Sequence, residues 1–335
     1  MKKILVIMIM VLLFVSGCTN NNDIKTKNNK VKTEERNNYV SYNGYLKVKN
    51  SKLVNDKNEE FRLRGISSHG LQWFGNLITD ENIKILKNEW KSNVFRLAMY
   101  TDEGGYISNK SIKDDLEKYI KIIVDNDMYV IVDWHILHDN DPNINKKEAL
   151  DFFDYMSKKY KNTPNVIYEI CNEPNGEEVT WNNHIKPYAE DIIKVIKKNN
   201  NKALIIVGTP NWSNKITDVI GNEIEEDNIM YSFHFYAGAE DTNDLRDRFK
   251  KAIESKLPVF VSEFGISDPS GNGGVFIDSA KEWMDILDKN NISYVNWSLA
   301  NKDESSAMLK PGVKSISDDG LSESGKFIKE QLLMK

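Results

Sequence analysis

The stretch Val166-Ile-Tyr-Glu-Ile-Cys-Asn-Glu-Pro174 predicts a short, buried β-strand that ends in polar residues. The segment Pro258-Val-Phe-Val-Ser-Glu-Phe-Gly265 has the same character, because an apolar and β-branched run reaches a glutamate and is closed by glycine. Short strands that are apolar throughout are typical of a parallel sheet covered by helices. The two stretches therefore indicate an α/β fold in which buried strands end at carboxylates.

The rest of the chain repeats this pattern, with eight strand-like runs and eight helical patterns in alternation. The predicted strands are residues 63–67, 94–99, 129–133, 166–170, 203–207, 229–235, 259–262 and 293–297. The predicted helices are residues 80–89, 112–126, 146–160, 183–199, 213–220, 244–255, 275–290 and 322–333. Eight such units predict a (β/α)8 TIM barrel, and a doubly wound open sheet is the alternative.

The placement of polar side chains favours the barrel, because they gather at or just past the carboxyl ends of the predicted strands. In a barrel those ends meet at one mouth, whereas in an open sheet they would spread along an edge. The residues concerned are Arg96, His135, Asn172, Glu173, His234, Tyr236, Glu263 and Trp297. Ahead of the barrel, residues 45–49 and 60–64 alternate apolar and polar around residues 55–58, which predicts a short N-terminal β-hairpin.

The N-terminus has the pattern of an export signal. Two lysines precede the apolar run of residues 4–15, which is too short to span a bilayer and ends in Val15-Ser-Gly-Cys18. Small residues before a cysteine resemble a bacterial lipobox, so we expect a lipoprotein signal peptide over residues 1–18. Lipid on Cys18 would anchor the exported protein to the membrane of the cell envelope, and ordinary secretion is the alternative. Residues 19–38 are polar and predict a flexible tether to a catalytic domain over residues 39–335.

Composition excludes several classes of protein. With 335 residues, 40% apolar and 28% charged, the chain is typical of a soluble globular protein, and its net charge of −5 shows no basic stripe for nucleic acid. If Cys18 is acylated, Cys171 has no disulfide partner and is expected to be packed and inert. Asp139 and Asp141 could suggest calcium, but a solvated acidic loop is the simpler interpretation. We expect a monomer without a cofactor.

Glu173 and Glu263 are the candidate catalytic residues. A carboxylate at the end of a buried strand is costly unless it has partners or a chemical task. Either glutamate alone could be a structural carboxylate in an ion pair. Together they match glycosidic-bond hydrolysis, in which one carboxyl group protonates the leaving oxygen and the other stabilises or attacks the anomeric carbon.

Five motifs, in order along the chain, resemble those of glycoside hydrolase family 5. They are Asp133-Trp-His135, Asn172-Glu-Pro174, Ser232-Phe-His-Phe-Tyr236, Ser262-Glu-Phe-Gly265 and Val295-Asn-Trp297. The resemblance runs from about residue 44 to the C-terminus and is greatest to bacterial endo-β-1,4-glucanases (cellulases) of the Bacillus type. It implies a retaining endo-β-1,4-glucanase with Glu173 as acid/base and Glu263 as nucleophile.

Five residues are predicted to support these two carboxyl groups. Arg96 can pair with Glu263 and keep it ionised, and Tyr236 can donate a hydrogen bond to the same carboxylate. Asn172 can bind the sugar 2-hydroxyl, a contact that strengthens in the transition state. The full supporting set is Arg96, His135, Asn172, His234 and Tyr236.

Aromatic side chains are expected to form the platforms on which sugar rings stack. Trp297 resembles the stacking tryptophan of the family, and Trp73, Tyr100 and Trp212 are candidates because each follows a predicted strand. The resemblance adds polar contacts on the non-reducing side of the substrate. The predicted substrate-binding residues are His69, Trp73, Tyr100, Trp212, Trp297, Lys302 and Glu304. Trp90, Trp181 and Trp283 lie in or near predicted helices and are expected in the core.

The expected substrate is a β-glucan polysaccharide or a cello-oligosaccharide. Phe264 stands where many relatives have tryptophan, and Pro210 is unusual after Gly208-Thr, departures that bear on substrate preference. Because related enzymes share this catalytic centre, a mannanase, a xylanase or a mixed-linkage glucanase is an alternative. A second alternative is a non-catalytic lipoprotein that binds polysaccharide in the same groove.

Overall fold

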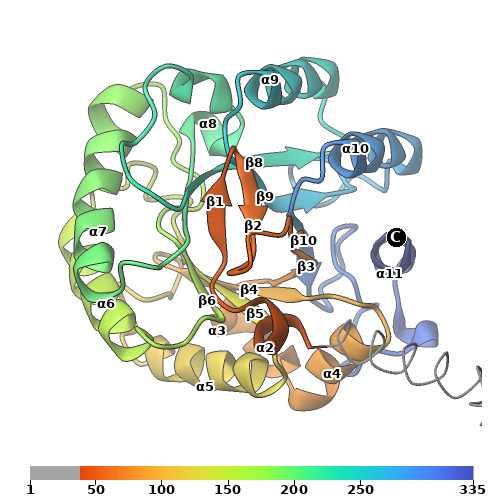
Figure 1. Ribbon diagram of the computed structural model, residues 1–335. Coiled ribbons are helices and arrows are strands. Elements are labelled where there is room, and N and C mark those ends of the chain that lie inside the picture. The colour runs from red at the N-terminus through yellow and green to blue at the C-terminus, as the bar shows by residue number, and fades with distance from the viewer. Residues whose placement is uncertain (1–37, 335) are drawn as a thin grey trace, which may run out of the picture. The chain divides into compact units, whose positions relative to one another are not determined.

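Eight parallel strands form a closed barrel in the computed structural model, which describes residues 38–334 (Figure 1). Around the ring the order is β10-β3-β4-β5-β6-β7-β8-β9. The strands are β3 (Arg64–Ser68), β4 (Val94–Tyr100), β5 (Tyr129–His135), β6 (Val166–Glu169), β7 (Ile205–Val207), β8 (Ile229–Tyr236), β9 (Val259–Gly265) and β10 (Tyr294–Leu299). The predicted (β/α)8 barrel is confirmed. The predicted signal peptide, lipobox Cys18 and nearly all of the tether lie outside the described residues.

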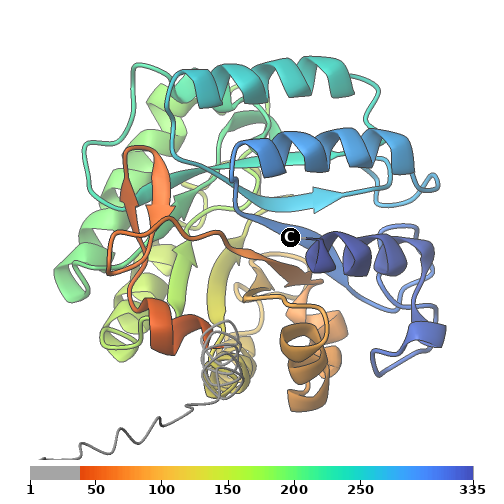
Figure 2. The same cartoon turned by 45° about the vertical axis from the view of Figure 1, so that its right-hand side comes forward.

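Helices form the outer layer around the strands (Figures 1 and 2). The longer ones are α4 (Asp80–Asn88), α5 (Ile112–Asp125), α6 (Lys146–Lys159), α7 (Lys186–Asn199), α9 (Thr242–Glu254), α10 (Ile277–Lys289) and α11 (Glu323–Leu333). The short ones are α2 (Tyr39–Asn43), α3 (Leu71–Phe74), η1 (Gly75–Leu77), η2 (Trp181–Ile185), α8 (Pro210–Ser213), η3 (Ile216–Val219) and η4 (Asp318–Gly320). Side chains cap the N-termini of α4 and α11, since Thr79 accepts a hydrogen bond from the Asn82 amide and Ser322 accepts one from the Gly325 amide.

One predicted helix is wrong. Residues 213–220 do not form one continuous α-helix: Ser213 ends a turn in which Asn211, Trp212 and Ser213 all have positive φ, at 57°, 56° and 57°, and only residues 216–219 are helical. These values give a left-handed turn, which side chains other than glycine rarely adopt. The turn is followed by the separate 3-10 segment η3.

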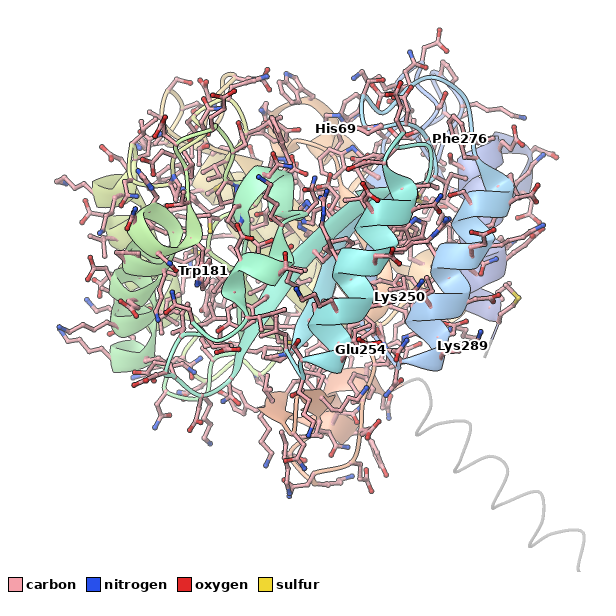
Figure 3. All side chains as sticks on the ribbon, turned by 90° about the horizontal axis from the view of Figure 1, so that it is seen from above. His69, Trp181, Lys250, Glu254, Phe276 and Lys289 are labelled. Atoms are coloured by element: carbon pink, nitrogen blue, oxygen red, sulfur yellow. The ribbon has the colours of Figure 1, made fainter. Side chains whose placement is uncertain are left out.

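The N-terminal hairpin is present, but its predicted second arm is wrong. Strand β1 (Lys47–Lys49) pairs antiparallel with β2 (Lys52–Val54), and not with residues 60–64. Asn50 and Ser51 have positive φ, at 50° and 62°, and so make the two-residue turn that hairpins favour. The hairpin lies across the N-terminal end of the strands, opposite the labelled His69 in Figure 3, and the Val48 amide donates to Asn228, next to β8.

The core fills the barrel and the space between strands and helices. Trp90, Trp181 and Trp283 are buried in it, as predicted, and the Trp283 ring stacks on Phe235 with centroids 4.0 Å apart. Cys171 is also buried, and burial raises its thiol pKa, which makes it inert. None of the helices within residues 38–334 has both the length and the apolar character needed to cross a bilayer.

Candidate active site

Arg96, on β4, is the centre of the polar network at the barrel mouth. Its guanidinium donates to Glu169 Oε2 at 2.7 Å, to Glu263 Oε2 at 3.0 Å and to Asn172 Oδ1 at 2.6 Å. Asp133 Oδ2 lies 3.0 Å from the same group. All five side chains are buried, and the fixed fork of an arginine suits several carboxylates at once. Arg96 therefore fixes the positions of side chains that come from β5, from β6 and the residues just past it, and from β9.

Glu263, on β9, is held as a carboxylate. Its Oε2 accepts from Arg96, and its Oε1 accepts from the Tyr236 hydroxyl at 2.8 Å. Burial raises the pKa of Glu263, the nearby Glu173 adds to the rise, and His234 and Arg96 oppose it. Because both oxygens act as acceptors, the contacts favour the ionised form. An ionised carboxylate aimed into the mouth can act as a nucleophile.

Glu173, just past β6, is held in the protonated form, unlike Glu263. Burial raises its pKa to about 8, and the charges of Asp133 and Glu169 add to the rise while Arg96 opposes it. Its Oε1 lies 2.8 Å from His234 Nδ1, and burial lowers the pKa of His234 to about 4. A neutral histidine therefore faces a carboxyl group that holds its proton at neutral pH.

Hydrogen bonds around Ser262 lead independently to the same protonation state. Its hydroxyl lies 2.6 Å from Glu169 Oε1, to which it donates its only hydrogen. His234 Nε2, 3.0 Å from Ser262 Oγ, must then be the protonated nitrogen of the neutral ring, and the Ser232 hydroxyl at 2.6 Å must also donate. Nδ1 is thus an acceptor, and the proton of that contact belongs to Glu173.

The two catalytic candidates lie close together. One oxygen of Glu173, one oxygen of Glu263 and one nitrogen of His234 lie within 4.8 Å of one another. Carboxyl groups about 5–5.5 Å apart are typical of retaining glycosidases, and inverting enzymes hold theirs at about 6.5–9.5 Å. Such a group could also hold a cation, but its ligand atoms are already committed to Arg96, Tyr236 and one another. The geometry therefore fits acid–base and nucleophilic chemistry better than a metal site.

Asn172 and His135 are buried and committed to protein partners. Asn172 Nδ2 donates to the Ile136 carbonyl at 3.1 Å and lies 3.3 Å from His135 Nε2. His135 Nδ1 contacts Asp133 Oδ2 at 2.6 Å, and burial holds the histidine pKa well below its usual range. In this structure the Asn172 amide thus positions Arg96 and His135, and both of its donor hydrogens are occupied.

A cavity of about 920 Å³ opens above these carboxyl groups. Its wall includes all seven predicted substrate-binding residues: His69, Trp73, Tyr100, Trp212, Trp297, Lys302 and Glu304. Trp73 and Trp212 are each 45% exposed, as sugar platforms need to be, whereas Trp297 is 6% exposed and stacks on His135 with centroids 5.3 Å apart. Lys302 pairs with Glu304 at the rim. Of the supporting set, Arg96 and Asn172 lie beneath the cavity and do not line it.

Sequence reasoning missed three members of the network: Asp133, Glu169 and Ser262. Asp133 and Ser262 stood inside quoted motifs, and Glu169 lies within an apolar strand. The available signal was a charged residue inside a buried strand, which needs a partner. Glu169 finds two, Arg96 and Ser262.

Comparison with known proteins agrees with this geometry. Residues 54–303 match the family described as "Cellulase (glycosyl hydrolase family 5)". The chain is 48% identical over 274 residues to Endoglucanase A of Evansella cellulosilytica, with 81% of this chain and 56% of that protein covered. It is 46% identical over 296 residues to Endoglucanase 5 of Pectobacterium carotovorum subsp. carotovorum, with 88% and 58% covered. The chain thus spans a little over half the length of these relatives.

The fold also matches that of a solved endoglucanase structure. The catalytic domain of Thermobifida fusca endoglucanase Cel5A, in complex with cellotetraose, superposes with a TM-score of 0.84 at 34% identity. The superposition covers 88% of this chain and 99% of that domain.

Proposed function

The chain belongs to glycosyl hydrolase family 5, and on that premise we propose that it is a retaining endo-β-1,4-glucanase. Its substrate would be an internal β-1,4 bond of cellulose or a related β-glucan. The observation that carries this proposal is the pairing of a protonated Glu173 with an ionised Glu263 at a separation within 4.8 Å. The same residue type in two environments supplies an acid and a nucleophile.

In the first step, Glu173 gives its proton to the glycosidic oxygen while Glu263 attacks the anomeric carbon. The carbon–oxygen bond to the leaving chain breaks, and a covalent glycosyl–enzyme ester forms. In the second step the Glu173 carboxylate removes a proton from water, and that water opens the ester. Two inversions at the anomeric carbon give net retention, and Glu173 regains its proton.

The neighbouring residues support these two roles. Arg96 and Tyr236 hold both oxygens of Glu263, which keeps the nucleophile ionised and aimed. His234, neutral and oriented by Ser262, keeps Glu173 in position without lending it positive charge. His135 and Asn172 do not contact either catalytic carboxyl group but position residues around them, because Asn172 accepts from Arg96 and His135 contacts Asp133.

An extended β-glucan is the substrate that the cavity favours. Exposed Trp73 and Trp212 offer flat apolar faces, and Lys302 and Glu304 offer polar groups for hydroxyls. The Thermobifida fusca relative is in complex with cellotetraose, a β-1,4-linked glucose oligomer. Mannan, xylan and mixed-linkage glucan are the alternatives among substrates. A purely binding lipoprotein is disfavoured, because both catalytic glutamates are present.

Product analysis tests the proposal. The protein should release reducing sugar from carboxymethylcellulose faster than from mannan or xylan, and proton NMR of the earliest product should show an excess of the β-anomer. Glu173→Gln and Glu263→Gln, with the fold checked by thermal unfolding, should lose nearly all turnover. An initial excess of α-anomer, or near wild-type rates in either variant, would contradict the mechanism.

We also propose that the protein is exported and anchored through lipid on Cys18. The support is the sequence pattern of residues 1–18 alone. A soluble secreted form is the alternative. Detergent partitioning of the protein produced in a bacterial host distinguishes the two.

A further inference from the structure

An asparagine stands directly before a glycine at three places in the chain: Asn43-Gly44, Asn175-Gly176 and Asn272-Gly273. Asparagine is one of the chemically labile residues, and this pair is its most reactive setting. The backbone nitrogen of the next residue can attack the side-chain carbonyl, and glycine has no side chain to obstruct the attack. The reaction needs an asparagine side chain that can turn and a following amide that is not held by a hydrogen bond.

The fold protects two of the three pairs. Asn43 and Asn175 are both buried. The Asn43 side-chain amide donates to the Tyr39 carbonyl at 2.6 Å. The Asn175 side-chain amide donates to the Leu137 and Glu173 carbonyls at 2.7 and 2.8 Å. Neither side chain can turn toward the following nitrogen without breaking buried hydrogen bonds, so both pairs should be inert in the folded protein.

Asn272 is exposed and its side-chain amide is free to move. It lies in the loop between β9 and α10, which ends at Phe276, at the same end of the barrel as His69 (Figure 3). Within residues 38–334 no hydrogen bond engages Asn272 Nδ2 or the Gly273 amide. Both requirements of the reaction are therefore met at this pair.

Two neighbouring side chains are placed to assist the attack. Gly273 has a φ of 73°, and a Cβ built on it would lie 1.9 Å from Asp268 Oδ2, so this carboxylate lies against the glycine backbone. A carboxylate there can act as a general base for the Gly273 amide proton. The Ser305 hydroxyl donates to Asn272 Oδ1 at 3.3 Å, on the oxygen that gains negative charge during the attack.

We propose that Asn272 is a site of deamidation, assisted by Asp268 and Ser305. The Gly273 nitrogen attacks Asn272 Cγ and loses its proton to Asp268. The bond from Cγ to Nδ2 then breaks, ammonia leaves with that proton, and a cyclic succinimide remains. Water opens the ring at either carbonyl, which gives aspartate or isoaspartate. In isoaspartate the main chain runs through the former side chain and is longer by one carbon.

The modified loop adjoins the substrate cavity. The Gly271 carbonyl accepts from the Ser306 amide at 2.9 Å, and the Ser306 hydroxyl donates to Glu304 Oε1 at 2.6 Å. Glu304 lines the cavity. A longer main chain at residue 272 should loosen this support and raise KM on cellohexaose about fivefold, equivalent to about 1 kcal/mol, with kcat unchanged. This effect on binding rests on the proposed glucanase function, whereas the deamidation itself does not.

Peptide mapping of the folded protein tests the chemistry directly. The protein is incubated at mildly alkaline pH in water enriched in heavy oxygen, and mass spectrometry then locates the label. We expect label at residue 272, as a mixture of aspartate and isoaspartate. Residues 43 and 175 should stay unmodified and serve as internal controls. In denaturant all three asparagines should react.

Three variants test the assigned roles. Asp268→Asn and Ser305→Ala should each slow the modification, the first about tenfold through loss of the base. Asn272→Gln should block it, because glutamine would have to close a larger ring. Asp285→Asn is the matched control, since Asp285 is an exposed acid on α10, and it should react at the wild-type rate. Thermal unfolding confirms that each variant is folded.

The outcomes separate the proposals. An intact Asn272 in the folded protein, or equal reaction at all three asparagines, overturns the site. Wild-type rates in both Asp268→Asn and Ser305→Ala overturn the assisted mechanism. An unchanged KM in fully modified protein, compared with Asn272→Gln incubated in the same way, overturns the effect on binding. Modification at residue 272 in a protein inactive on every glucan supports the site and overturns the glucanase proposal.

Discussion

Replacing Glu169 with glutamine should shift the pH dependence of catalysis. Glu169 is fully buried, accepts from Arg96 at 2.7 Å and from Ser262 at 2.6 Å, and does not itself line the cavity. Glutamine has nearly the same shape but no charge, and Arg96 keeps Glu263, Asp133 and Asn172 as partners. The glutamine oxygen can accept from Arg96 while its amide nitrogen donates to Ser262 Oγ, and the Ser262 hydroxyl then turns toward Ser232 Oγ, 2.6 Å away. The substitution therefore removes one negative charge from the neighbourhood of Glu173 without moving Glu173 or Glu263.

The magnitude follows from the position of His234 between the two carboxyl groups. The ring contacts Glu173 Oε1 at 2.8 Å through Nδ1 and lies 3.9 Å from Glu169 Oε1 through Nε2. Across the ring the two carboxyl groups are about 8–9 Å apart, and at an effective dielectric constant of about 20 a unit charge contributes about 2 kcal/mol. Since the Glu169 charge raises the pKa of Glu173, its removal should lower that pKa by about 1.4 units, at about 1.36 kcal/mol for each unit.

The assay is kcat/KM against pH on an aryl cellobioside, where the alkaline limb reports the protonated acid of the free enzyme. In Glu169→Gln that limb should move to lower pH by about 1.4 units. Glu117→Gln is the control, because Glu117 on α5 pairs with Lys159 on the outside of the barrel. An alkaline limb that stays in place, or moves to higher pH, in a folded Glu169→Gln protein would refute the reasoning.

Three further changes have definite expected outcomes. Trp297→Ala should lower kcat/KM on a cello-oligosaccharide by on the order of one to several kcal/mol of transition-state stabilisation, and an unchanged value would make this tryptophan a core residue only. The stability of Glu173→Gln relative to wild type should increase as pH rises. The pKa of Glu173 is raised from 4.5 to about 8, so the protonated carboxyl group stabilises the wild-type fold fully below pH 4.5. That contribution is lost as pH rises through 8, and the glutamine variant does not lose it. Thermal unfolding at pH 4.5 and 9 checks this, and an equal difference at both would contradict it. Cys18→Ala should abolish detergent partitioning, whereas identical partitioning would indicate another anchor.

The barrel could be predicted from the sequence because its signal is repeated. Each of the eight predicted strands overlaps an observed strand, since a buried parallel strand must be apolar throughout. The two errors, the hairpin arm and the helix at residues 213–220, have a common cause. Both come from consecutive residues with positive φ, at Asn50-Ser51 and at Asn211 to Ser213. Serine and tryptophan carry no strong preference for that conformation, so pattern alone does not reveal it.

The candidate site could be predicted only where polar residues end apolar strands. Glu173 and Glu263 stand at such ends, and the structure brings their carboxyl groups together. Glu169 and Ser262 lie on strands β6 and β9, where sequence reasoning assigned the interior to the core. Their contact exists because the barrel is closed and its inward side chains meet at the axis. That proximity is a property of the closed ring and cannot be read from either strand alone.

The excess of acid over base at the barrel centre explains why the two catalytic glutamates differ. One guanidinium, that of Arg96, contacts Asp133, Glu169 and Glu263, while the side-chain partner of Glu173 among residues 38–334 is the neutral His234. Holding all four carboxyl groups ionised in a buried site would leave uncompensated negative charge, so protons are retained where compensation is weakest. Burial raises the pKa of Asp133 to about 7 and that of Glu173 to about 8. The proton therefore stays on the carboxyl group without a direct contact to Arg96, which is the one that faces the leaving oxygen, and each negative charge added beneath it strengthens the acid's hold on that proton.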